Sequence, residues 1–182
     1  MASFSLTFKA GAGALEAVRR HGFDPASIGT IAGASGGAKW LVLSKLDRAI
    51  QASIVPRLEG PVHLVGSSIG SWRLACYAQA DPVAAVERFE QAYLTQSYSD
   101  DPDIHEITAR ARDSLGIVLG EHGVDEILSN PLFRLHVRTV RSRGVLASER
   151  PALLGPGLLA AAFCNVASRS TLGWIYERAL FH

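Results

Sequence analysis

The chain has 182 residues, of which 48% are hydrophobic and 19% are charged, a balance typical of one globular domain with a substantial core. The formal net charge is +1 and no polybasic run occurs, which argues against nucleic acid as a partner. The six histidines and two cysteines show no metal-binding spacing, so neither a metal nor an organic cofactor is expected.

The first half of the chain alternates strand-like and helix-like segments. In chain order they are Phe4–Phe8 (strand), Ala12–Gly22 (helix), Ile28–Gly33 (strand), Ala38–Ala52 (helix), Pro61–Gly66 (strand) and Ile69–Ala80 (helix). Four large apolar residues of the second helix are spaced to share one buried face, namely Trp40, Leu43, Leu46 and Ile50.

The second half begins with a helix over Asp81–Gln96, for which Asp81 is a suitable cap and Pro82 suits the first turn. Further elements are predicted as a helix from Ile104, a short helix over Val124–Asn130, a strand over Phe133–Gly144 and a helix from about Leu158. The apolar stretch 151–167 is interrupted by Gly155, Pro156 and Gly157 and is shorter than the roughly 20 apolar residues that span a bilayer.

Strands that alternate with helices favour βαβ units. We therefore expect one α/β domain over residues 1–182, a three-layer sandwich with a mostly parallel central sheet. The N-terminus has neither the charged nor the long apolar part of a signal peptide. The expected location is cytoplasmic, with no transmembrane segment and at most transient contact with a membrane surface.

Two Gly-x-Ser-x-Gly motifs stand at strand-to-helix turns. "GSSIG" places Ser68 between Gly66 and Gly70, the arrangement of a nucleophile elbow. "GASGG" places Ser35 between Gly33 and Gly37. Consecutive glycines let backbone N–H groups converge on one point, and in acyl transfer that point is where the oxyanion develops.

The order of the two motifs resembles the patatin-like phospholipase family. That family has a glycine-rich oxyanion loop followed by a basic residue, and the nucleophile elbow comes one helix and one strand later. The resemblance covers about Ile28 to Tyr93. It implies a serine acyl hydrolase that cleaves lipid or related acyl esters through an acyl-enzyme. Non-catalytic binding of an anionic or lipid ligand is the alternative.

Transferred to this sequence, the resemblance makes Ser68 the nucleophile, supported by Gly66 and Gly70. The N–H groups of the oxyanion hole are then those of Gly36, Gly37, Ala38 and Ile69, with Lys39 in the basic position. A rival alignment uses residues 9–14 as the oxyanion loop and makes Ser35 the nucleophile.

The catalytic aspartate of that family lies in an Asp-Gly pair, and this chain contains none. Without a base, a serine hydroxyl is a weak nucleophile, so little activity is expected from this chain alone. We expect an N-terminal fragment or truncated member, or else a degenerate one. A third hypothesis is a conventional triad that uses His136, although its alternation with arginines favours solvent exposure.

Overall fold

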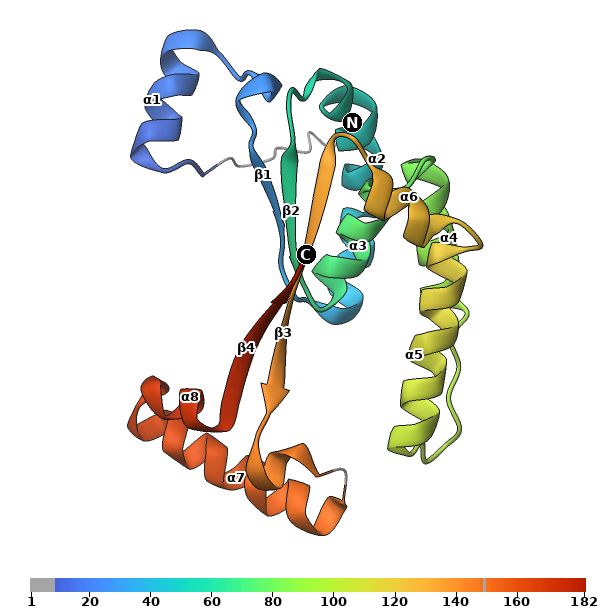
Figure 1. Cartoon of the computed structure of the whole chain (residues 1–182), viewed down its shortest axis with the longest axis vertical. Helices are drawn as coiled ribbons and strands as arrows, with labels where there is room; N and C mark the ends of the chain where they lie inside the picture. Colours follow the sequence, from blue (N-terminus) through green and yellow to red (C-terminus); the bar gives the residue numbers. More distant parts are fainter. Residues whose placement is uncertain (1–8, 149) are drawn as a thin grey trace, which may run out of the picture.

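The computed structural model describes residues 9–148 and 150–182, which form an α/β fold around one four-stranded sheet (Figure 1). The strands are β1 (Thr30–Gly33), β2 (Val62–Ser67), β3 (Phe133–Ser142) and β4 (Tyr176–Phe181), adjacent in that order. β1, β2 and β3 are parallel, whereas β4 is antiparallel to β3.

The expectation of a mostly parallel sheet is therefore wrong, because the sheet is mixed. β3 is longer than β2, and β4 pairs with the second half of β3, over Val137–Ser142, of which only Val137 and Arg138 also pair with β2. A parallel fourth strand would need a crossover along the whole length of the sheet. Instead, the helices between β3 and β4 lie at the far end of these two strands (Figure 1), so the chain returns antiparallel.

Eight α-helices occur in the part of the chain that the structure describes. They are α1 (Ala12–His21), α2 (Ser44–Ser53), α3 (Ile69–Tyr77), α4 (Pro82–Leu94), α5 (Ile104–Leu119), α6 (Gly123–Ser129), α7 (Pro151–Ala167) and α8 (Leu172–Ile175). Short 3₁₀ helices occupy Pro25–Ser27, Gly37–Leu43, Val55–Arg57, Gly144–Ala147 and Arg169–Thr171.

Most predicted elements are found close to their expected positions. The carboxylate of Asp81 accepts a hydrogen bond from the N–H of Ala84 and caps α4, as predicted. The predicted strand Phe4–Phe8 lies outside the described residues. α7 begins at Pro151 rather than near Leu158, because Pro151 occupies the first turn, where a missing N–H costs nothing.

The helix predicted over Ala38–Ala52 differs in two respects. Its first part is the 3₁₀ helix that ends at Leu43. The face of α2 that is buried is polar, with Ser44, Asp47 and Gln51, whereas Leu46 is exposed. The predicted buried face is confirmed for Trp40, which is buried, and for Ile50, which packs against the core. It is wrong for Leu46, because its neighbour Asp47 is buried instead, in an ion pair described below.

One face of the sheet is buried and the other is open. Along β2, Val62, Leu64 and Gly66 are buried, whereas His63, on the opposite face, is exposed. Side chains alternate between faces along a strand, and the packed helix α3 covers the buried face. The described residues include no buried side chain of α1, so the expected third layer is not confirmed.

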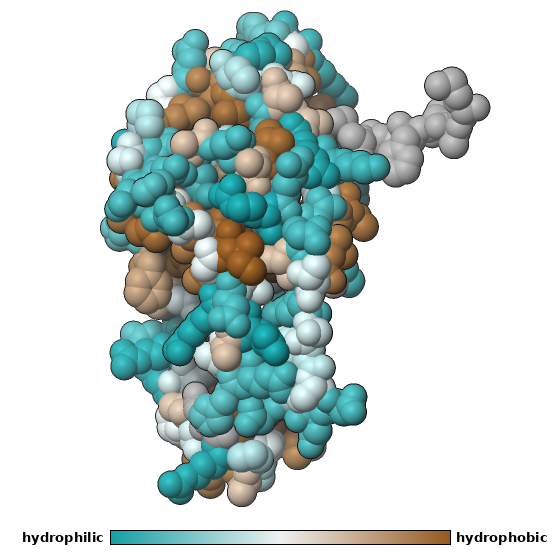
Figure 2. All heavy atoms as spheres, turned by 90° about the vertical axis from the view of Figure 1, so that its right-hand side faces the viewer, coloured by the Kyte–Doolittle hydropathy of each residue, from teal (hydrophilic) through white to brown (hydrophobic). Residues whose placement is uncertain are grey.

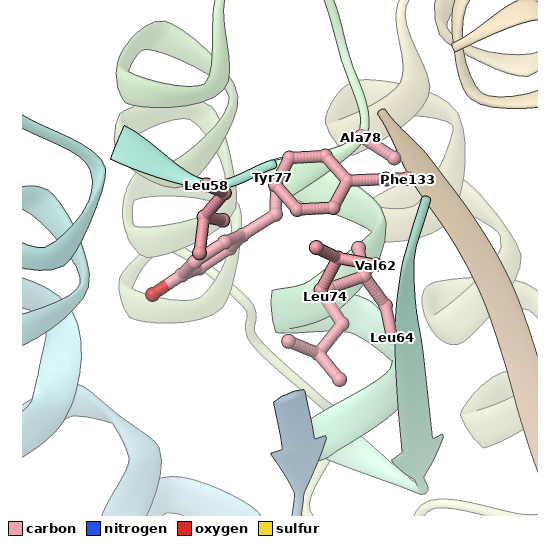
Figure 3. Close-up of a cluster of buried hydrophobic side chains, with 7 residues drawn as sticks. All are labelled: Leu58, Val62, Leu64, Leu74, Tyr77, Ala78 and Phe133. Atoms are coloured by element: carbon pink, nitrogen blue, oxygen red, sulfur yellow. The ribbon is translucent and has the colours of Figure 1, made fainter. Parts of the chain in front are cut away.

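The core cluster next to the site lies between β2, β3 and α3. Figure 3 shows its side chains, with the Tyr77 ring reaching past Leu58 and its hydroxyl pointing out of the cluster. Val62 and Leu64 are completely buried, and full burial of such side chains contributes about 1.5–3 kcal/mol each. This packing fixes the end of β2 against the helix that follows Ser68.

Helices α5 and α6 are less well packed. Val118 is the one residue of α5 that is buried among the described residues, and several apolar side chains of the two helices are exposed. They include Ile107, Ile117, Val124 and Leu128. Figure 2 faces this side of the molecule and shows hydrophobic groups between hydrophilic ones. None of the described helices has the length and apolar character needed to cross a membrane.

Candidate active site

The two Gly-x-Ser-x-Gly motifs begin at adjacent positions in the sheet. Gly33 ends β1 and Gly66 lies near the end of β2, and these two glycines are register partners in the parallel pair. Because carboxyl ends of parallel strands meet at the same edge of a sheet, the two turns that follow lie side by side. The fold therefore places the two motifs found in the sequence next to each other.

Ser68 has an unusual backbone conformation, with φ 52° and ψ −131°. Among the described residues it is the one non-glycine with positive φ. Residues other than glycine rarely occupy this region, and holding one there costs about 1–3 kcal/mol. A strained serine between a strand and a helix is the geometry of a nucleophile elbow.

The glycines around Ser68 permit close backbone packing. A Cβ on Gly70 would lie 2.2 Å from the carbonyl oxygen of Gly33, and one on Gly66 would lie 2.4 Å from the Cα of Ser71. Real Cβ atoms are essentially never that close to another heavy atom. The first turn of α3 is thus pressed against both β1 and β2, which supports the strained elbow.

Ser35 makes contacts that Ser68 does not make. Its hydroxyl lies 3.2 Å from the carbonyl oxygen of Ser67, to which it donates, and 3.1 Å from the Ser67 hydroxyl. It therefore connects the first turn to the second. Ser68, in contrast, makes no side-chain hydrogen bond within residues 9–148 and 150–182. This difference favours Ser68 over Ser35 as the nucleophile, an assignment that stays a prediction.

The loop after Ser35 brings some of the predicted oxyanion residues to Ser68. Gly37 has φ +53°, which suits glycine, and it lines a pocket together with Ser68 and Ile69. Gly36, Ala38 and Lys39 are exposed neighbours in the same loop, and the Lys39 N–H donates to the Gly36 carbonyl oxygen at 3.3 Å. They do not line that pocket.

The pocket shared by Ser68 and Gly37 has a volume of about 270 Å³, slightly below the range of sites for drug-sized ligands. Its wall is largely aromatic, and we call it the aromatic pocket. The aromatic side chains that line it are Trp72, Phe89, Tyr93 and Tyr98. Such a surface suits an apolar group of modest size held beside the Ser68 hydroxyl.

Phe89 of α4 connects the two motifs. Its ring stacks on Trp40, which follows the first motif, with centroids 4.1 Å apart, and on Trp72, which follows the second, at 5.7 Å. Aromatic pairs contribute about 0.5–1.5 kcal/mol beyond the area that they bury. Each tryptophan follows its motif by two or three residues in the sequence, but no local pattern pointed to their shared partner.

An ion pair buried between α2 and α3 was missed by the sequence analysis. The Arg73 guanidinium donates to the Asp47 carboxylate at 2.8 and 2.5 Å, and the Tyr77 hydroxyl donates to it at 3.0 Å. Burial lowers the pKa of Arg73, but the hydrogen bond and charge of Asp47 raise it by more. Burial, followed by the charge of Asp47, raises the pKa of Tyr77. This network ties the helix after the elbow to α2.

The structure does not bring a histidine to Ser68. His136 on β3 lies with its Nε2 atom 2.8 Å from the Nδ1 atom of His63 on β2, on the open face of the sheet. Burial, then the neighbouring His63 and His182, lower the pKa of His136. His136 is half-buried in this contact rather than simply exposed. The triad hypothesis therefore has no support from the geometry.

Within the described part of the chain, no group of three or more metal-binding side chains is placed to hold an ion. The two cysteines are not bonded to each other, and Cys76 is buried whereas Cys164 is exposed. Burial raises the pKa of the Cys76 thiol to about 12. Neither thiol lies in the aromatic pocket.

Comparisons with protein-family models, with curated proteins and with solved structures return no match for this chain. The function must therefore be argued from the site itself.

Proposed function

We propose that this chain is a patatin-like serine acyl hydrolase that acts on lipid or related acyl esters, within a three-layer domain of that kind. The observation that carries the proposal is the strained backbone of Ser68 at the end of β2. A second glycine-rich turn lies beside it, and an aromatic pocket opens from it. Each of these features has a defined part in acyl transfer.

In the proposed reaction the Ser68 oxygen attacks the ester carbonyl and loses its proton to a base. The N–H groups of Gly37 and Ile69, at the pocket, stabilise the oxyanion, and the loop N–H groups of Gly36 and Ala38 contribute to the same hole. Collapse of the tetrahedral intermediate expels the alcohol, which takes up a proton. Water then hydrolyses the acyl-enzyme and releases the acid.

The aromatic pocket is the proposed binding site of the acyl group. Its volume of about 270 Å³ exceeds the roughly 150 Å³ cavity that accommodates benzene in another protein, so a short or medium acyl chain fits. Trp72 is one helical turn after Ser68 and lines the pocket. An acyl chain there would place its carbonyl carbon beside the Ser68 hydroxyl.

The described residues do not supply a base for the Ser68 hydroxyl. No described side chain makes a hydrogen bond with the Ser68 hydroxyl, and the His63 and His136 rings contact each other. Removal of the base from such a unit costs about 10⁴-fold in rate or more. We therefore expect slow turnover from this chain as it stands.

Hydrolysis of 4-nitrophenyl butyrate tests the proposal. We expect slow release of nitrophenol that is abolished by Ser68→Ala and retained by Ser35→Ala, with both variants folded by circular dichroism. Loss of activity with Ser35→Ala alone would favour the rival alignment. A folded protein without any turnover would favour the second candidate, a non-catalytic domain that binds an anionic or lipid ligand, which the absence of a base at Ser68 also fits.

A further inference from the structure

A second pocket also reaches Ser68 and has a different chemical character. It has a volume of about 270 Å³ and is lined by Ser67, Ser68, Arg138, Thr139, Val140 and Arg178. We call it the basic pocket. Ser68 lines both the basic and the aromatic pocket, so the two pockets meet at the proposed nucleophile.

The sheet pairing accounts for the position of the two arginines. Arg138 on β3 is the register partner of Ser67 on β2, the residue before Ser68. Val140 lies two residues further along β3 and is the register partner of Arg178 on β4. Residues two apart on a strand share a face, and diagonal neighbours across a pair lie within reach of long side chains. Both guanidinium groups are therefore brought to the pocket next to Ser68.

Among the described residues, no carboxylate balances the charge of this pocket. No carboxylate lines it, and neither Arg138 nor Arg178 makes an ion pair or a side-chain hydrogen bond with any described residue. Arg73 pairs with Asp47 and Arg143 with Glu177 at 2.9 Å, whereas Arg138 and Arg178 are among the described arginines that have no such partner. Two neighbouring like charges repel, and a bound anion would offset that repulsion.

We propose that the basic pocket binds an oxyanion carried on the alcohol part of the ester, such as a phosphate or a carboxylate. A planar guanidinium donates paired hydrogen bonds to such groups. The inference rests on the proposed function, because it assigns the two pockets at Ser68 to the two halves of one substrate. The acyl group occupies the aromatic pocket, and the anionic alcohol extends over Ser67 toward Arg138 and Arg178.

The anion site is tested first without catalysis. Ser68→Ala protein is titrated with phenyl phosphate and, separately, with benzoate by isothermal titration calorimetry. We expect Arg138→Met and Arg178→Met each to weaken binding by about tenfold, equivalent to about 1.4 kcal/mol. Arg141→Met is the matched control, because Arg141 is also exposed on β3 but outside the pocket, and it should leave the affinity unchanged. Tighter binding of phenyl phosphate than of benzoate would identify phosphate as the preferred group.

Kinetics then connect the pocket to the reaction. The substrates are phenyl butyrate and 4-(butyryloxy)phenyl phosphate, which share the acyl group and differ in the charge of the alcohol. Arg138→Met should raise KM for the phosphate ester about tenfold more than KM for phenyl butyrate, whereas Arg141→Met should not change the ratio.

Failure of the two proposals can be told apart. Arginine-dependent anion binding without turnover of either ester would overturn the hydrolase and leave the anion site in place. In another outcome, the esters are turned over while anion affinity is the same in the wild type and in the arginine variants, all of them folded by circular dichroism. That result would overturn the anion site alone. An affinity for each anion that falls as much in Arg141→Met as in the two pocket variants would also overturn it, because binding would then not depend on the pocket.

Discussion

Replacement of Gly70 by alanine should damage both the stability and the site of this protein. The new Cβ would lie 2.2 Å from the Gly33 carbonyl oxygen, 2.4 Å from the Gly33 carbonyl carbon and 2.8 Å from the Ala34 oxygen, all of them backbone atoms. Each gap must open to at least 3.0 Å. No flexible side chain can move aside, so α3 must shift away from β1.

Overpacking of a tight core typically costs about 1–3 kcal/mol, and the helix propensity of alanine offsets only about 1 kcal/mol. Because every close contact is with backbone, the cost lies at the upper end of that range, and we expect Gly70→Ala to lower the free energy of unfolding by about 2 kcal/mol after the offset. Displacement of a reacting group by about 1 Å can cost 10²-fold in rate, so covalent labelling of Ser68 should slow by a comparable factor.

Gly116→Ala is the matched control. Gly116 lies within α5, and a Cβ there would meet nothing within 4 Å. It should stabilise the protein by about 0.4–1 kcal/mol. Urea denaturation followed by circular dichroism measures both variants. Equal stability of Gly70→Ala and wild type, with an unchanged labelling rate, would refute the idea that close packing of α3 on β1 holds the elbow.

Three other predictions concern the ion pair, the thiols and the histidine pair. Asp47→Asn should lower the free energy of unfolding by about 3–5 kcal/mol, because it leaves Arg73 buried without its charged partner, and the double variant that combines Asp47→Leu with Arg73→Met should recover part of the loss in urea denaturation. Iodoacetamide at pH 7.5 should modify the exposed Cys164 but not the buried Cys76, whose pKa is raised to about 12, and peptide mapping by mass spectrometry would expose a reactive Cys76 as a contradiction. The pKa of His136 is lowered from its ordinary value of 6.5 by burial and by neighbouring histidines. As the pH falls, His136 therefore takes up a proton at a higher pH in the unfolded chain than in the folded protein. The free energy of unfolding should therefore be highest above pH 6.5 and fall as the pH drops below it. His136→Gln should reduce that fall in denaturation curves measured between pH 7.5 and pH 5.

Local signals in the sequence located most elements of the fold. The cap at Asp81, the period-2 pattern of β3 and the glycine turns all depend on neighbouring residues, and such interactions are visible in a single sequence. The antiparallel strand β4 was not visible, because its pairing depends on where the chain returns after α7. Leu46 of α2 was wrongly predicted to be buried, because Asp47 takes the buried position and is stabilised by Arg73, 26 residues away.

The candidate site was predictable to a similar extent. The motifs identified Ser68 and the loop at Gly36 and Gly37, since close backbone approach and positive φ select glycine. The contact of Ser35 with Ser67 and the pairing of Arg138 with the end of β2 depend on strand register, which no local pattern fixes. These contacts underlie the proposed roles of the two motifs, and only the fold reveals them.

The assignment of Ser68 as nucleophile can be decided by covalent labelling with a fluorophosphonate probe, followed by peptide mapping. We predict a label on the peptide that contains Ser68, formed slowly for lack of a base and lost in Ser68→Ala. A label on Ser35 would reverse the roles of the two motifs. A folded protein that takes up no label would contradict the serine hydrolase and favour the anion-binding domain.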